Sequence, residues 1–80
     1  MMSDHQDSEH FMGVRDEDEI LAMLDRAERL KNWHELYAKK GAGLGRVERI
    51  MHMRNYKALE GVVKTLRWTL GDKTVEHPLE

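Results

Sequence analysis

Two long runs of side chains at helical spacing, separated by one glycine-rich stretch, constrain the fold of this 80-residue chain most strongly. The first stripe repeats every three or four residues and consists of Ile20, Met23, Leu24, Ala27, Leu30, His34, Tyr37 and Ala38. The second is mainly apolar as well and consists of Leu44, Val47, Met51, Asn55, Ala58, Leu59, Val62, Leu66, Thr69 and Leu70. Such spacing is typical of one helix face, and neither run alternates as a strand does. The chain is therefore predicted to be all-α.

Capping residues indicate where the two predicted helices begin and end. Asp16 precedes the first stripe, and its carboxylate can accept a hydrogen bond from the backbone N–H of Asp18 or Glu19. Gly71 follows the second stripe and can adopt the left-handed conformation that ends many helices. We therefore expect one helix over about 17–40 and another over about 44–71, joined by the short glycine-rich turn GAGLG.

Helices joined by such a short turn pack antiparallel, so residues 16–72 are predicted to form an antiparallel helical hairpin. Residues 1–15 lack an apolar period and are expected to form a flexible acidic arm. Residues 73–80 are expected to form a flexible tail. The chain is thus one small domain with a short extension at each end.

One helix pair covers only one side of each stripe. In a hairpin that turns near Ala42, residues whose numbers add up to roughly 85 face each other, which places His34 opposite Met51 and Ala27 opposite Ala58. Two helices of a chain this short rarely bury enough apolar area alone. We therefore expect a twofold homodimer in which two hairpins form a four-helix bundle.

Two polar residues within the stripes each have two interpretations. Asn55 can pair with its symmetry mate and fix the register of a dimer, or it can bond to a backbone carbonyl or water at the edge of the stripe. His34 can be a neutral, hydrogen-bonded ring, or it can be a pH-sensitive group whose protonation places a charge among apolar side chains. The sequence leaves both alternatives open.

Four large apolar residues lie off the main stripes or at their edge and are candidates for contact with a protein partner. They are Trp33, Ile50, Met53 and Trp68. Exposed apolar patches usually mark interaction sites, and tryptophan is enriched at the energetic centres of interfaces. The sequence therefore favours a small non-enzymatic regulator or adaptor that binds the surface of a partner protein. The same residues could instead serve self-association.

The charges of the chain are unevenly distributed and suggest an alternative. The first 19 residues carry seven acids and one base, whereas residues 41–71 carry six bases and two acids. A row of bases opposite the second stripe consists of Arg46, Arg49, Lys57, Lys64 and Arg67. Such a row could follow a phosphate backbone, which makes RNA or DNA binding the alternative function. The sequence pI of about 6.2 is low for a nucleic-acid-binding domain.

Residue types and spacing predict no catalytic centre, cofactor or metal site. The chain has no cysteine, and no two of its five histidines are three or four residues apart, as two ligands on one helix would be. The GAGLG sequence lacks the Lys-Ser/Thr pair of a phosphate-binding loop. No serine, histidine and aspartate arrangement suggests a nucleophile. We expect a protein that is not an enzyme.

The hydropathy of the chain predicts no contact with membranes. The mean hydropathy is -0.73, and no stretch approaches the roughly 18 apolar residues that a spanning helix needs. The first ten residues are acidic and polar, unlike a secretory signal. We therefore expect a cytoplasmic protein.

Overall fold

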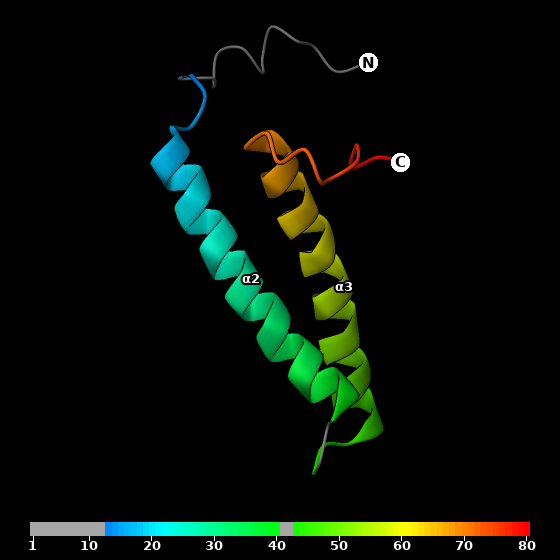
Figure 1. Cartoon of the computed structure of the whole chain (residues 1–80). Helices are drawn as coiled ribbons and strands as arrows, with labels where there is room; N and C mark the ends of the chain where they lie inside the picture. The colour runs from blue at the N-terminus through cyan, green and yellow to red at the C-terminus, as the bar shows by residue number, and fades with distance from the viewer. Residues whose placement is uncertain (1–12, 41–42) are drawn as a thin grey trace, which may run out of the picture.

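The computed structural model describes residues 13–40 and 43–80 and consists of two long helices. Helix α2 spans Glu17–Lys39 and helix α3 spans Arg46–Thr69, and the two pack against each other in opposite directions (Figure 1). This confirms the predicted all-α helical hairpin. Most of the predicted acidic arm, and two residues of the glycine-rich turn, lie outside the described residues.

Local hydrogen bonds explain where α2 begins and α3 ends. Asp16 lies in extended backbone, and its Oδ1 accepts from the Glu19 N–H at 2.9 Å. Gly71 ends α3 with a φ of +85°. Its N–H donates to the Trp68 carbonyl, and the next N–H, from Asp72, donates to the Arg67 carbonyl. These two bonds form a Schellman motif, in which a left-handed glycine satisfies the last free carbonyls of a helix.

The core between the helices is thin. The buried hydrophobic side chains are Ala27 and Ala38 of α2 and Val63 of α3, and no large side chain of the described residues is fully buried. The alanines are small enough to let α3 approach α2 closely, but they bury little apolar area. Most other side chains between the helices are half-buried. The hairpin therefore leaves much of its apolar surface in contact with solvent.

The predicted pairing across the hairpin is wrong for α3. Met51 and Ala58, expected opposite His34 and Ala27, are both exposed, whereas Val63 is buried. His34 instead meets His52. Helix α3 is thus rotated about its axis relative to the prediction, so that one edge of its apolar stripe contacts α2. The stripe is wider than a single neighbouring helix can cover. The apolar pattern alone therefore does not show which of its residues contact α2.

The last residues turn back beside the end of α3. The Asp72 carboxylate accepts from the Thr74 N–H at 2.9 Å, and the His77 ring packs edge-on against Trp68 at 5.3 Å between ring centroids. Val75 is half-buried. The tail from 73 to 80 therefore makes local contacts in this structure, and its flexibility stays a prediction.

Candidate functional site

The two long faces of the hairpin differ in chemistry. We call one the apolar face, and its residues are Met23, Leu30 and Trp33 of α2 with Val47, Met51, Ala58 and Val62 of α3. We call the other the charged face, and its residues are Glu28, Lys31, Glu35 and Lys39 of α2 with Lys57, Glu60, Lys64 and Arg67 of α3. The line of closest contact between the helices, marked by Ala27 and Val63, separates them.

Contacts between the helices show which flanks lie on the same side. Glu28 of α2 pairs with Arg67 of α3, so these two flanks lie together. On the other flank of α2, the rings of Trp33 and Tyr37 each lie 5.3 Å from the ring of His52. At about 100° per residue, Met51 and its neighbours on the stripe lie on the flank of α3 away from Arg67. Met23, Leu30 and Trp33 of α2 and Val47 and Met51 of α3 therefore share one face, whereas other exposed apolar residues, such as Leu36 and Ile50, lie outside it.

The apolar face is open to solvent over the length of both helices. Met23 and Met51 are each 56% exposed, and Val47 is 69% exposed. Leu30 and Trp33 line a shallow groove together with Arg26 and Arg29. Large exposed apolar patches are uncommon on monomeric soluble proteins and are typical of interaction surfaces. The chemistry of this face is suited to binding another apolar surface.

A cluster of four rings lies at the edge of this face near the turn. The Nδ1 atoms of His34 and His52 are 2.9 Å apart, and both rings are half-buried. Trp33 packs edge-on against His34 at 4.9 Å, and Tyr37 stacks on His52. At this separation one Nδ1–H donates to the lone pair of the other ring. Burial, and then the neighbouring His52, lower the pKa of His34, so its neutral form is favoured.

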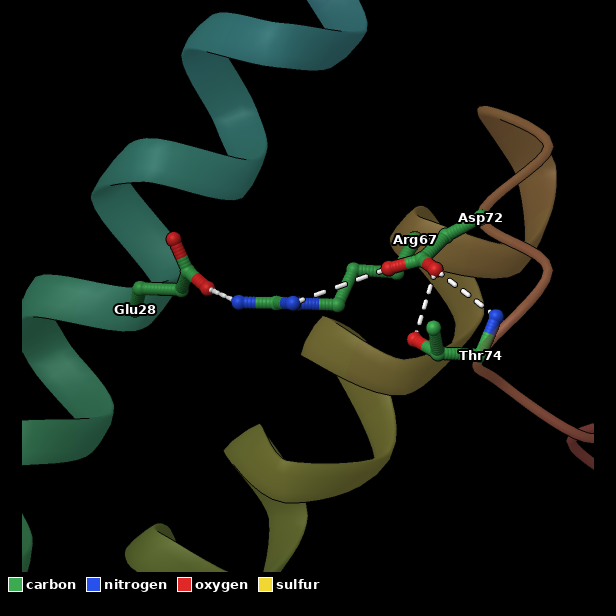
Figure 2. Close-up of polar contacts among 4 residues, drawn as sticks. All are labelled: Glu28, Arg67, Asp72 and Thr74. Atoms are coloured by element: carbon green, nitrogen blue, oxygen red, sulfur yellow. Dashed lines mark hydrogen bonds and ion pairs between the residues drawn. The ribbon is translucent and has the colours of Figure 1, made fainter.

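The charged face is held together by ion pairs (Figure 2). Arg67 reaches across from α3 to Glu28 on α2, and its other Nη lies 3.6 Å from Asp72. The side-chain and backbone hydrogen bonds of Thr74, and then Arg67, lower the pKa of Asp72. The same face carries the Glu35–Lys39 and Lys57–Glu60 pairs, at 2.7 and 3.5 Å. The three acids of this face therefore each pair with one of its five bases.

The predicted row of bases is divided by these acids. Lys57 pairs with Glu60, and Arg67 pairs with Glu28. Lys64 is half-buried and lines a shallow pocket that also contains Glu28 and Glu60. Arg46 and Arg49 lie together near the turn, where they line a groove with Ala38, Ile50 and Met53. The row is thus uninterrupted by carboxylates only at its turn end.

The four residues predicted to contact a partner do not form one surface. Trp33 lies on the apolar face, whereas Ile50 and Met53 lie together in the groove with Arg46 and Arg49. Trp68 lies near the other end of α3, beside His77. The structure therefore brings Ile50 and Met53 together and separates both tryptophans from them.

Sequence reasoning missed which residues form the exposed apolar face, and it missed the pair of histidines. Each stripe was expected to be covered on one side only, but the predicted pairing placed Met51 opposite His34, and the spacing did not show which edge of the α3 stripe would remain uncovered. His52 was missed because only ligands within one helix were considered. The register could have found it, since it placed His34 opposite Met51, which is one residue away.

Two further observations limit what the site can be. Within residues 13–40 and 43–80, no group of three or more His, Asp or Glu side chains is arranged to hold a metal ion. Neither α2 nor α3 is long and apolar enough to cross a bilayer. Comparison of the chain with protein-family models, curated proteins and solved structures found no match.

Proposed function

We propose that this protein is a small non-enzymatic interaction module that binds protein surfaces through its apolar face. The first occupant of that face is a second copy of the chain, in a homodimeric four-helix bundle. The observation that carries the proposal is the exposure of Met23, Leu30 and Trp33 on α2 and of Met51 and Val47 on α3, all on one side of the hairpin.

The position of the α3 stripe supports a bundle rather than an isolated hairpin. In a four-helix bundle each helix contacts two neighbours, so its apolar stripe is centred between the two directions of contact. Leu59 and Leu66 lie on the edge of the stripe near α2 and are half-buried, whereas Met51 and Ala58 lie on the far edge and are exposed. The far edge is where a second hairpin would pack.

The thin core supports the same proposal. Among the residues that the structure describes, the buried hydrophobic side chains are Ala27, Ala38 and Val63, which make a weak hydrophobic core. Packing the apolar faces of two copies together would remove further apolar surface from water and stabilise both. A cytoplasmic regulator or adaptor of this kind could then exchange its second copy for the apolar surface of another protein.

RNA or DNA binding is a second proposal, and one observation favours it. Arg46 and Arg49 line the same groove, and within the described part of the chain neither makes an ion pair. A nucleic acid would therefore bind near the turn rather than along all of α3. The pairing of Lys57 and Arg67 with acids reduces the positive potential elsewhere, so we place this proposal second.

Sedimentation equilibrium from 1 to 100 µM tests the first proposal. We expect a mass of twice the 9.4 kDa chain, with dissociation at the lowest concentrations. Binding of a labelled single-stranded DNA at 20 and 200 mM NaCl tests the second. A monomer at every concentration that binds DNA in a salt-dependent way would favour nucleic-acid binding over the interaction module.

A further inference from the structure

Two histidines from different helices meet at the edge of the apolar face. His34 of α2 and His52 of α3 direct their Nδ1 atoms at each other, 2.9 Å apart. Trp33 and Tyr37 pack around the two rings and restrict their orientation. The rings are half-buried, so the pair is held in place but can still be reached from solvent.

We propose that His34 and His52 form a two-imidazole site for a divalent transition-metal ion of the zinc class, such as Zn²⁺, Ni²⁺ or Cu²⁺. Imidazole nitrogens bind Zn²⁺ at about 2.0–2.1 Å. Two nitrogens bound at that distance with an angle of about 90–110° between them lie about 2.9–3.4 Å apart. The observed separation of 2.9 Å lies in this range, so both nitrogens are close enough to bind one ion once each ring turns to point its Nδ1 lone pair at the ion instead of at the other ring.

The protonation chemistry of the pair is compatible with metal binding. A histidine binds a metal through the lone pair of a neutral ring. In the pair without metal one Nδ1 carries a proton, and on binding this proton moves to Nε2 of the same ring, so two Nδ1 lone pairs face the ion. The lowered pKa of His34 favours the neutral ring near pH 7.

The donor set also predicts the kind of site. No third imidazole or carboxylate within residues 13–40 and 43–80 completes a cluster, so water fills the remaining positions. A site with two protein ligands is weaker than a closed structural zinc site with four. Because the two ligands come from α2 and α3, the ion would cross-link the helices and stabilise the folded hairpin. This inference does not depend on the proposed function.

Thermal unfolding with added ZnCl₂ at pH 7.5 tests the proposal. For the intact chain we expect the midpoint to rise by several degrees between 10 µM and 1 mM zinc, and to rise less at pH 5.5, where protons compete more strongly with the ion for imidazole nitrogens. His34→Gln and His52→Gln should each abolish the rise. His77→Gln is the matched control and should keep it. No rise, or a rise that persists in both His34→Gln and His52→Gln, would overturn the proposal.

A second measurement remains decisive if either variant fails to fold. His5, His10 and His77 are the other histidines of the chain, and His5 and His10 lie outside the described residues. Paramagnetic Ni²⁺ added to the intact protein should broaden the ring resonances of His34 and His52 at lower concentration than those of the other three. Equal broadening of all five, or earlier broadening of His5 and His10, would mean that the pair is only hydrogen-bonded.

Discussion

On the charged face of the hairpin, side chains find their partners within the chain. Arg67 joins both helices and the tail through Glu28 and Asp72, and Asp72 is in turn held by Thr74 (Figure 2). On the apolar face, Leu30 and Met51 are 40% and 56% exposed, although both helices supply further apolar side chains there. The charged face thus contains ion pairs formed within the chain, whereas the apolar face leaves large apolar side chains exposed to solvent.

This difference indicates where free energy of association lies. Exposed ion pairs contribute little, because water screens them and their side chains lose entropy. Full burial of a leucine or methionine side chain contributes about 1.5–3 kcal/mol. A partner would therefore gain far more by covering the apolar face than by covering the charged face. The predictions below test this contrast, from the largest expected effect to the smallest.

The largest effect is expected from a charge placed on the apolar face. Leu30→Glu should raise the dissociation constant of the dimer at least tenfold, or about 1.4 kcal/mol, because a carboxylate would be desolvated in the interface. Leu36→Glu is the matched control, since Leu36 has similar exposure but lies on the other flank of α2. Sedimentation equilibrium measures both. Equal weakening by the two variants would contradict the assignment of the interface to the apolar face.

A smaller effect is expected in the contact between the helices. Val63 is 8% exposed, and Val63→Ala should lower the free energy of unfolding by about 1–2 kcal/mol, through lost burial and a small cavity. Val14→Ala is the control, because Val14 is 97% exposed and should change little. Urea unfolding at one fixed protein concentration measures both variants. A neutral Val63→Ala would mean that Val63 does not lie in the core.

The histidine pair should make the metal-free hairpin sensitive to pH. Because folding lowers the pKa of His34, the unfolded chain binds more protons below the ordinary pKa near 6.5. The stability contribution is therefore present above that pH and is lost as pH falls toward the lowered value. Urea unfolding in EDTA at pH 7.5 and 5.5 should show this loss, and His34→Gln should reduce it. A loss of the same size in His34→Gln would assign the effect to other groups.

The smallest effect is expected on the charged face. Glu28→Gln removes the carboxylate that pairs with Arg67, but both side chains are partly exposed, at 32% and 43%. We expect a smaller loss of stability than for Val63→Ala, and one that shrinks further in 1 M NaCl as the charges are screened. Asp25→Asn, which breaks the more exposed pair with Arg29, should have less effect still. A loss for Glu28→Gln that exceeds that of Val63→Ala would contradict the contrast between the faces.

Local chemistry made the helix ends predictable, and packing made the contact between helices less so. The carboxylate of Asp16 and the left-handed φ of Gly71 depend on a few neighbouring residues, and the structure has both as expected. The rotation of α3 depends on which part of a wide stripe faces α2. Nothing in the sequence shows that Val63, and not its neighbour Val62 in the stripe, is the valine buried against α2. The predicted register came within one residue of the histidine pair, since it placed His34 opposite Met51 and the structure places His34 against His52.

The candidate site was predictable in kind but not in position. Trp33 and Trp68 are exposed but lie on different parts of the hairpin, and their contact with a partner stays a prediction. The exposed residues Met51 and Leu30 belong to the stripes themselves. A residue pattern records that a side chain is apolar, but it does not record whether the same chain or a second one covers it.

The two tryptophans allow the central claim, that the apolar face is the interface with a second copy, to be tested directly. Trp33 and Trp68 have nearly equal exposure, 49% and 46%, but only Trp33 lies on the apolar face. Trp68→Phe leaves Trp33 as the single tryptophan, and Trp33→Phe leaves Trp68. We predict that between 1 and 100 µM protein the emission of Trp33 shifts to shorter wavelength and becomes less accessible to acrylamide, while that of Trp68 does not change. A change at Trp68 with none at Trp33, or no change at either while the chain remains a monomer, would contradict the account.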